Sequence, residues 1–393
     1  MAVFTATDKD GKTISWKDHK RWMWLLGPVN IFVPLFSYWL YFQTGNPLTT
    51  LIPAIHLFGV IPTLDRLIGE DPFNPPEEVV PAMTRDPFYR RMVWFMVILP
   101  YIGFFFAAWF VGTQDLPWWA IVILAIGVGT ANGNAINIAH ELGHKPNRLD
   151  RFMAKMALAV SGYGHFCIEH NRGHHVKVST PEDCSSARMG ESVYAFALRD
   201  LPGALKGGWQ QEAKRLKARG KPFFHWENEL LQVYAMTLAI TIGLVLWLGL
   251  DVLPFILLHH FLSWYALTQV NYIEHYGLLR QKLPNGKYEP CQPRHSWNTN
   301  HIVSNLMQIH LQRHSDHHAN PLRPYQALRN FDELPRLPSG YPGCLGLAAF
   351  PPLWFKVMDP KVMEWADGDL SRVNICPRAK ARLEAQYGQT NSP

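Results

Sequence analysis

WWAIVILAIGVGTANGNAINIAHELGHK, residues 118–145, joins an apolar segment directly to a pair of histidines. The segment is mostly apolar from Trp118 to Ala139, which is long enough for a helix to cross the hydrocarbon core of a bilayer. His140 and His144 follow at once and stand four residues apart, so they share one face of the same helix. This stretch therefore predicts a membrane-spanning helix that carries imidazoles at the membrane surface.

Apolar residues are concentrated in blocks along the rest of the chain. Of the 393 residues, 48% are hydrophobic and 17% are charged, against roughly 25% charged in an average soluble domain. Six blocks have the length of a membrane span: residues 22–42, 48–68, 92–111, 118–139, 230–250 and 252–272. A shorter block at residues 152–166 predicts a helix packed against the bundle. We therefore expect an all-α membrane protein with six transmembrane helices.

The basic residues indicate how these spans are oriented. The connections after the first, third and fifth spans (QTGNP, GTQDLP and LGLDV) contain no Lys or Arg, whereas the other connections and both ends of the chain carry the basic clusters. Since cytoplasmic loops are enriched in Lys and Arg, we expect both termini and the polar connections in the cytoplasm. The net charge of +6 does not indicate nucleic acid binding, because the basic residues form no single stripe beside stacking aromatics.

This topology divides the chain into two parts. Residues 1–278 are expected to form the transmembrane bundle, with an inserted cytoplasmic histidine segment at about 140–228, and residues 279–393 a cytoplasmic cap. The cap is rich in Pro and Gly, so we expect it to be largely irregular. The polar opening of the sequence lacks the apolar run of a signal peptide, so no cleavage is expected.

Histidine is the most unusual feature of the composition, with 18 residues in the chain. Four clusters lie at the cytoplasmic ends of spans or in cytoplasmic segments: NIAHELGHK, EHNRGHH, NYIEHYG and LQRHSDHHA. The four-residue spacing of the first cluster recurs at His170 and His174. The clusters contain His140, His144, His170, His174, His175, His275, His314, His317 and His318. Because the predicted topology puts all of them on one side, they can meet in one plane.

Nine imidazoles gathered in one plane indicate metal binding. Unpaired buried imidazoles are costly and protonated ones repel one another, and a metal ion removes both costs. Coordination numbers of four to six are usual for these metals, so at least two ions are implied. The five cysteines stand singly with no CxxC pair, which argues against a disulfide framework and against thiolate zinc sites.

The four motifs HELGHK, EHNRGHH, NYIEHYGL and LQRHSDHHA together resemble the histidine signatures of the bacterial integral-membrane alkane 1-monooxygenases. The resemblance extends from the first span into the cap. It implies a non-haem diiron enzyme of hydrocarbon degradation in the inner membrane, which uses O2 to hydroxylate medium-chain n-alkanes to 1-alkanols. It also implies that the nine clustered histidines are the ligands of two iron ions.

The chemistry of the reaction agrees with this resemblance and requires a partner. Breaking an unactivated C–H bond needs a redox metal and O2. The chain has no CxxC iron–sulfur pair, no nucleotide-binding glycine motif and no haem signature, so a separate carrier must deliver the electrons. The resemblance implies rubredoxin, reduced by a flavoprotein rubredoxin reductase. We expect its acidic surface to dock near basic residues of the cap and loops, namely Arg280, Lys282, Arg294 and Arg323.

Two further sets of residues are candidates around the metal. Polar side chains next to the ligands are candidates for orienting the imidazoles: Glu141, Glu169, Glu274, Asp316, Asn137 and Asn271. An apolar slot between spans would present only the terminal methyl of an alkane that is concentrated in the bilayer. The candidates for its lining are Leu57, Phe58, Ile61, Ile136 and Leu267.

Two alternatives remain at this stage. A membrane fatty-acyl or lipid desaturase or hydroxylase of the same histidine-box superfamily would act on a chain that carries a head group, and a desaturase would yield an alkene. A metal transporter or a structural zinc protein would hold the same histidines without turning over a substrate. Product analysis distinguishes the first alternative, and metal content with O2-dependent turnover distinguishes the second.

Overall fold

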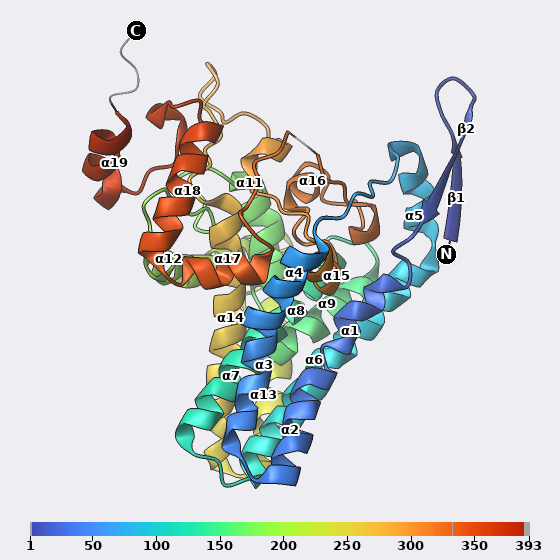
Figure 1. The fold of residues 1–393 in the computed structure, drawn as a ribbon, viewed down its shortest axis with the longest axis vertical. Coiled ribbons are helices and arrows are strands. Elements are labelled where there is room, and N and C mark those ends of the chain that lie inside the picture. Colours follow the sequence, from blue (N-terminus) through green and yellow to red (C-terminus); the bar gives the residue numbers. More distant parts are fainter. Residues whose placement is uncertain (1, 332, 389–393) are drawn as a thin grey trace.

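The computed structural model describes residues 2–331 and 333–388. Within these ranges, six helical segments are long and apolar enough to cross a membrane: Met23–Thr44, Pro47–Ile68, Pro87–Thr113, Trp118–Gly143, Glu229–Leu248 and Leu250–His275. Each overlaps the span predicted for it. The segments form a bundle with a cap at one end (Figure 1). The prediction of an all-α protein with six membrane helices is confirmed.

Several of these segments consist of more than one helix. The first segment contains α1 (Leu26–Val29) and α2 (Phe32–Thr44), the second contains α3 (Ile52–Ile55) and α4 (Ile61–Ile68), and the fourth contains α7 (Trp118–Asn132) and α8 (Asn134–Gly143). The third, fifth and sixth segments contain one α-helix each: α6 (Pro87–Thr113), α13 (Glu229–Leu248) and α14 (Leu253–His275). A π-helical turn at His56–Val60 joins α3 to α4. Two of these helices start at polar caps: the Asp86 side chain accepts from Phe88 N before α6, and the Asn228 side chain accepts from Leu230 N before α13.

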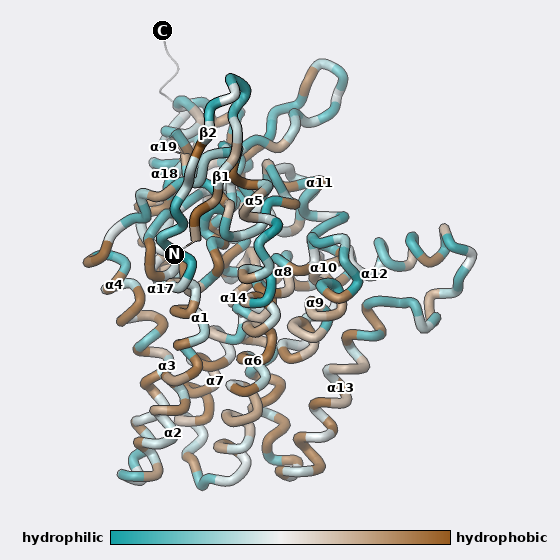
Figure 2. Tube along the Cα trace, turned by 90° about the vertical axis from the view of Figure 1, so that its right-hand side faces the viewer, coloured by the Kyte–Doolittle hydropathy of each residue, from teal (hydrophilic) through white to brown (hydrophobic). Residues whose placement is uncertain are grey.

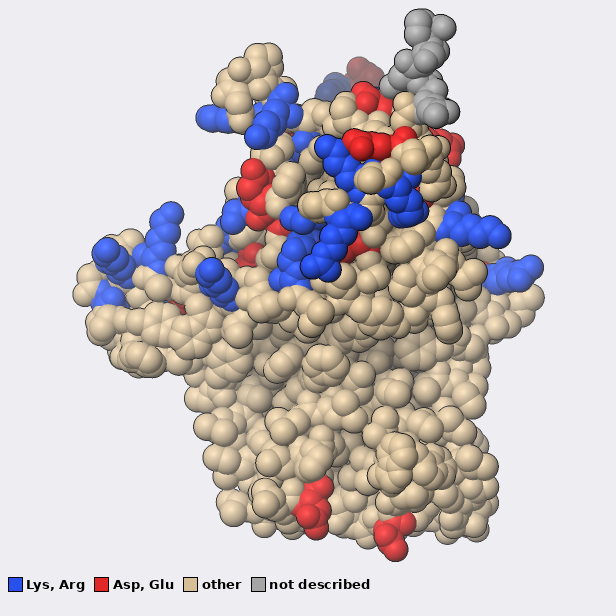
Figure 3. All heavy atoms as spheres, turned by 90° about the vertical axis from the view of Figure 1, so that its left-hand side faces the viewer, with Lys and Arg blue, Asp and Glu red and all other residues tan. Residues whose placement is uncertain are grey.

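The surface is divided into an uncharged band and a charged region. In Figure 2 the lower part of the bundle is predominantly hydrophobic and the cap is predominantly hydrophilic. On the face shown in Figure 3, Lys and Arg lie only in the upper part of the molecule, and the band below them is uncharged until a few acidic residues at its lower end. This distribution is that of an integral membrane protein whose basic loops all lie on one side.

The fourth and sixth segments form the centre of the bundle, where α7 packs against α14. Two glycines of the fourth segment allow this close approach. A Cβ atom at Gly133 would lie 2.9 Å from Ala266 Cβ, and one at Gly129 would lie 3.0 Å from His259 O. Small residues at helix contacts let backbones approach in membranes. The central helices that carry His140 and His275 are thereby held side by side.

The inserted segment and the cap are both more helical than composition suggested. The insert contains α9 (Arg148–Ser161), α10 (Phe166–Glu169), α11 (His175–Lys177) and α12 (Val193–Ala218). The cap contains α15 (Ile302–Met307), α16 (His314–Ala319), α17 (Tyr341–Ala348), α18 (Pro351–Trp365) and α19 (Lys380–Tyr387). More than half of the described cap residues lie outside these α-helices, as expected, but the helices themselves were not predicted. Trp354, Met358 and Val362 are fully buried at helical spacing, a pattern that the Pro and Gly content obscured.

The N-terminal stretch forms an element that the sequence analysis did not predict. β1 (Ala2–Thr7) pairs antiparallel with β2 (Thr13–Asp18), with Ala2 opposite Asp18. Gly11 adopts a φ of +79° in the connecting turn, a conformation that costs glycine little. α5 (Val80–Arg85) contacts β1. The hairpin therefore lies on the cap side of the molecule (Figure 1).

Candidate metal centre

The first histidine cluster lies at the end of the fourth membrane segment. α8 continues that segment beyond Gly133 and carries His140, which is buried, and His144 forms the C-cap of α8. The two ring centroids lie 5.0 Å apart, as expected for residues on one helical face. The apolar segment thus positions its own ligands at the membrane surface.

The second cluster departs from simple helical spacing. A regular helix would put His170 and His174 on one face, but His170–His174 form a π-helical turn. Because a π-helix brings together residues five apart, His170 pairs with His175, and their Nε2 atoms lie 2.9 Å apart. The Nδ1 atom of His174 lies 2.9 Å from Asp183 Oδ2. The turn therefore assigns neighbouring histidines to two different groups.

Five imidazoles form the larger group, called site A. They are His140, His144, His170, His175 and His317, and one nitrogen of each lies within 4.8 Å of those of the others. His317 Nε2 lies 2.8 Å from His140 Nε2 and 3.3 Å from His175 Nε2. The donors of site A come from three segments that are far apart in the sequence.

Four imidazoles form the second group, called site B. His174, His275, His314 and His318 are all buried, and one nitrogen of each lies within 4.8 Å of those of the others. The Nε2 atoms of His314 and His318 are 2.9 Å apart. The His318 ring centroid also lies 4.6 Å from that of His175, so sites A and B are neighbours. All nine predicted histidines belong to one of the two sites.

Burial keeps most of these imidazoles neutral. It lowers the pKa of His144 to about 3, and it lowers the pKa values of His170, His317 and His318 well below their ordinary value. His174 differs: burial lowers its pKa, but the adjacent Asp183 carboxylate outweighs this effect and raises the pKa above its ordinary value. Neutral imidazole is the form that binds metal ions.

The donor atoms fit a metal ion in each site. The Nε2 atoms of His144, His174 and His275 are buried and have no hydrogen-bond partner among the described residues. Because Asp183 holds Nδ1 of His174, the Nε2 atom of this ring is left to bind a metal. Unpaired buried nitrogens cost free energy, which an ion in each group removes. Imidazole suits iron, copper, nickel and zinc, and each group offers enough donors for one such ion.

The predicted polar neighbours of the ligands have different surroundings. Glu274 Oε2 lies 3.1 Å from His314 Nε2, and Tyr341 donates a 2.5 Å hydrogen bond to its other oxygen. Glu141 pairs with Lys145 at 2.8 Å. Burial raises the pKa of Asp316, which accepts from Arg323 Nη1 at 3.0 Å. Of these three carboxylates, only Glu274 contacts an imidazole within the described residues.

The other three polar candidates lie beside the ligands without binding them. Glu169 packs against Gly173, where a Cβ atom would lie 2.3 Å from Glu169 Oε1, and burial raises the pKa of Glu169 to about 8. Asn137 donates to Gln308 O at 2.7 Å. Asn271 is half-buried on α14, one helical turn before His275.

Asp183 is a site residue that the sequence analysis missed. Its Oδ2 atom accepts from Ser186 Oγ at 2.6 Å and contacts His174 Nδ1 at 2.9 Å. The His174 imidazole holds the pKa of Asp183 below its usual range, against burial, which raises it. Asp183 lies in a polar loop without helical periodicity, nine residues after His174. No spacing rule therefore connects it to the histidine clusters.

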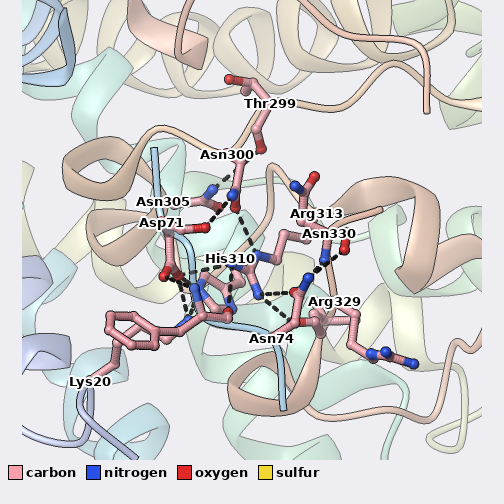
Figure 4. Close-up of polar contacts among 12 residues, drawn as sticks. Lys20, Asp71, Asn74, Thr299, Asn300, Asn305, His310, Arg313, Arg329 and Asn330 are labelled. Carbon is pink, nitrogen blue, oxygen red and sulfur yellow. Dashed lines mark hydrogen bonds and ion pairs between the residues drawn. The ribbon is translucent and has the colours of Figure 1, made fainter. Parts of the chain in front are cut away.

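A buried charged network beneath α16 was also missed (Figure 4). Asp71 Oδ2 contacts Lys20 Nζ at 2.5 Å, Arg313 Nη2 at 2.9 Å and His310 Nε2 at 3.6 Å. Burial lowers the pKa of Lys20 to about 7 and that of Arg313 to about 10. Since Arg313 directly precedes His314, this network fixes the start of the helix that carries three ligands.

An apolar cavity of about 190 Å³ lies between the membrane segments. Leu57, Ile61 and Leu267, three of the predicted channel residues, line it. The other two candidates are not among its lining residues: Phe58 is 38% exposed on the outside of the bundle, and Ile136 is fully buried in the core. Near the metal, the lining includes Asn137, Val270 and Leu311. These three residues precede His140, His275 and His314 by three to five positions.

The four basic residues predicted for carrier docking differ in accessibility. Arg280 is only 8% exposed and donates to the carbonyl oxygens of Val176 and Glu289. The side chain of Arg323 is 9% exposed and is paired with Asp316 and Glu77. By contrast, Lys282 is exposed and Arg294 is partly exposed. The two accessible residues are therefore the better docking candidates.

The fold and the two histidine sites define an integral-membrane metalloprotein of the histidine-cluster type. A family model for fatty acid desaturases matches residues 116–344. Alkane 1-monooxygenase 1 of Alcanivorax borkumensis is 45% identical over 98% of this chain and 95% of that protein, and alkane 1-monooxygenase of Pseudomonas putida is 48% identical over 91% and 89%. The xylene/toluene monooxygenase hydroxylase component of Pseudomonas putida is 29% identical over 58% and 60%. The chain belongs to the alkane 1-monooxygenase family.

Proposed function

We propose that this protein hydroxylates the terminal methyl group of medium-chain n-alkanes with O2 and releases 1-alkanols. The observation that carries the proposal is the cavity whose lining includes Asn137, Val270 and Leu311, three to five positions before histidines of both sites. The alkane 1-monooxygenase relatives support the reaction class. A cavity that is lined mostly by apolar groups and lies among the membrane segments suits a hydrocarbon chain.

The metal ions in the proposal are two irons, one in site A and one in site B. Iron binds imidazole and supplies the redox chemistry with O2 that C–H hydroxylation needs. Nine imidazoles would hold the ions, and an imidazole ligand adds no charge. Asp183 contacts His174 Nδ1 and orients this ring from outside the donor set. Glu274 instead contacts His314 Nε2, the nitrogen that also faces His318 in site B.

Substrate enters from the membrane in this proposal. Each methylene group transferred from water to lipid gains about 0.8 kcal/mol, so n-alkanes are concentrated in the bilayer. The cavity lies among the membrane segments and is lined by residues of the first four and the sixth. Its shape confines an alkane so that one chain end faces the ligands. Terminal rather than internal attack follows from this confinement.

Electrons come from rubredoxin in this proposal, reduced by a flavoprotein rubredoxin reductase. The sequence contains no nucleotide or haem motif and no CxxC pair. Lys282 and Arg294 are the exposed basic residues at which an acidic carrier would dock. The location that agrees with the relatives and with the basic loops is the bacterial inner membrane, with both termini and the metal sites in the cytoplasm.

The test combines iron quantification with turnover. The purified protein should contain two irons per chain and should convert n-octane to 1-octanol only when O2, rubredoxin and its reductase are present. Formation of alkenes from a lipid substrate would instead support a desaturase. Zinc in both sites with no turnover would contradict the proposal.

A further inference from the structure

Several polar side chains line the cavity, and most of them are already paired with one another. Asn30 Oδ1 contacts His56 Nε2 at 2.9 Å, and Asn132 Nδ2 contacts His259 Nε2 at 2.9 Å. Both pairs lie within the membrane bundle and join neighbouring segments. Each contact pairs one end of the asparagine amide with an imidazole nitrogen inside an apolar region.

Asn137 differs in its position, because it lies on α8 three residues before His140, and one end of its amide is left to the cavity. Its Nδ2 atom donates to Gln308 O at 2.7 Å and to Asn134 Oδ1 at 3.1 Å. Since both partners can only accept, the NH2 end of the amide must face them. Asn137 is 5% exposed, and among the described residues no donor contacts its Oδ1 atom. A nearly buried acceptor is therefore free on the cavity wall.

Gln308 supplies the complementary group on the same wall. Its Oε1 atom accepts from Gln312 Nε2 at 2.8 Å, and its Nε2 atom has no acceptor in the described part of the chain. Gln308 lines the cavity together with Asn137. The two residues are in contact through Asn137 Nδ2 and the backbone oxygen of Gln308. A hydroxyl group can both donate and accept a hydrogen bond, so an Asn oxygen and a Gln nitrogen on one cavity wall suit it.

The place of Asn137 on α8 connects this pair with the proposed reaction. Asn137 precedes His140 of site A by three residues on α8, about one helical turn. The end of an alkane that has reacted would carry its new oxygen at this end of the cavity. An alkane has no group for Asn137 or Gln308 to bind, whereas the alcohol formed from it does.

We propose that Asn137 and Gln308 bind the hydroxyl group of the 1-alkanol product: the hydroxyl donates to Asn137 Oδ1 and accepts from Gln308 Nε2. This inference rests on the proposed alkane hydroxylation. A hydroxyl buried in an apolar cavity without partners is destabilised, and the pair removes that penalty at the metal end of the cavity. The alcohol is thereby retained with its oxidised end toward the metal, and it competes with the next alkane.

The test measures binding of 1-octanol and of n-octane to the iron-loaded, detergent-solubilised protein without O2 or reductant, so that no turnover occurs. Asn137→Leu keeps a similar volume and removes the acceptor. We expect its affinity for 1-octanol to fall about fivefold, as for loss of one neutral hydrogen bond, with n-octane affinity unchanged. The matched control is Asn30→Leu, the same replacement where the oxygen already contacts His56, and it should retain 1-octanol affinity.

A second variant keeps the test decisive if Asn137→Leu fails to bind iron. Gln308→Met removes the donor with little change in volume and should also weaken 1-octanol binding and 1-octanol inhibition of n-octane turnover. Equal 1-octanol affinity in wild type and both variants, or an equal loss in Asn30→Leu, would overturn the inference. Failure of the proposed function is distinct, because wild-type protein would then form no 1-octanol from n-octane.

Discussion

His174 has the most clearly defined surroundings of the nine clustered imidazoles. Asp183 contacts its Nδ1 atom, and Ser186 in turn donates to Asp183. This chain of contacts fixes both the tautomer and the orientation of the ring. His260, in contrast, lies in the membrane bundle with its Nδ1 atom 3.3 Å from that of His259. The two kinds of histidine should respond differently to replacement.

Replacing His174 or His318 by alanine removes one of the four donors of site B. We expect each variant to lose iron from that site and to lose alkane hydroxylation. His260→Ala should keep both irons because His260 belongs to neither site. Iron content by atomic emission, measured beside n-octane turnover, checks this prediction. Full iron loading of the first two variants would contradict the ligand assignment.

Asp183→Asn should weaken iron binding without removing a donor. The amide can still contact His174 Nδ1, but it carries no charge to stabilise the ring as a ligand, and loss of such an outer partner typically costs about 10- to 100-fold in metal affinity. Titration with a competing chelator measures the change. Glu182→Gln, at the neighbouring exposed position, is the matched control and should leave iron affinity unchanged.

At the scale of elements, the two π-helical turns lie at the two functional regions. One, His170–His174, divides the second histidine cluster between sites A and B. The other, His56–Val60, interrupts the second membrane segment where that segment lines the cavity. A π turn changes which side chains share a helix face. In the second segment it leaves Leu57 on the cavity wall and Phe58 exposed.

Leu57→Ala should change the range of alkane lengths that the enzyme accepts. The smaller side chain enlarges the cavity, so longer alkanes can extend past position 57 while the terminal methyl group still reaches the metal sites. The gain is limited to about 1 kcal/mol per additional methylene group. Product analysis across a series of n-alkanes measures it, with Phe58→Ala as the control outside the cavity. An unchanged length profile would show that Leu57 serves only in packing.

At the scale of the whole molecule, Asp71 joins three distant parts of the chain. It pairs with Lys20 near the N-terminus and with Arg313 of the cap, and it lies itself in the loop after the second membrane segment. Solvent reaches almost none of the side chains of Lys20, Asp71 and Arg313. Removing the carboxylate would leave two buried cations together.

Asp71→Asn should therefore destabilise the protein by about 3 kcal/mol, the usual cost of breaking a buried ion pair. Because Arg313 precedes His314, we also expect easier loss of iron from both sites on heating. A thermal unfolding curve with parallel iron release measures both effects. Asp367→Asn, which removes an exposed carboxylate paired with Arg372, is the control and should change stability little.

Docking of the electron carrier is also a property of the whole surface. Reversing the charge at Lys282 and Arg294 together should raise the Michaelis constant for rubredoxin about fivefold and leave iron content unchanged. Wild-type kinetics should weaken with added salt, because charges are screened over roughly 8 to 10 Å. Reversal of Lys9 and Lys12, exposed in the N-terminal hairpin, is the matched control. Carrier kinetics insensitive to salt and to the first reversal would reject this surface.

The membrane segments and the nine clustered histidines are evident from the sequence alone. The six segments follow from apolar length alone, since a bilayer requires about 20 apolar residues per helix. His140 and His144 share a helix face through local spacing, which needs no tertiary information. The restriction of the four histidine clusters to one side of the membrane follows from the same topology. For these features, the deciding interactions are local or are made with the solvent.

Only the tertiary structure decided how the nine histidines divide into five and four. The π turn at His170–His174 depends on packing around Gly173, and Asp183 reaches His174 through a loop without periodicity. The partners of Asp71 lie 51 and 242 residues away in the sequence. Contacts at such separations arise from the packing of the whole chain, which local spacing does not encode. The helices of the cap and the polar end of the cavity also depend on this packing.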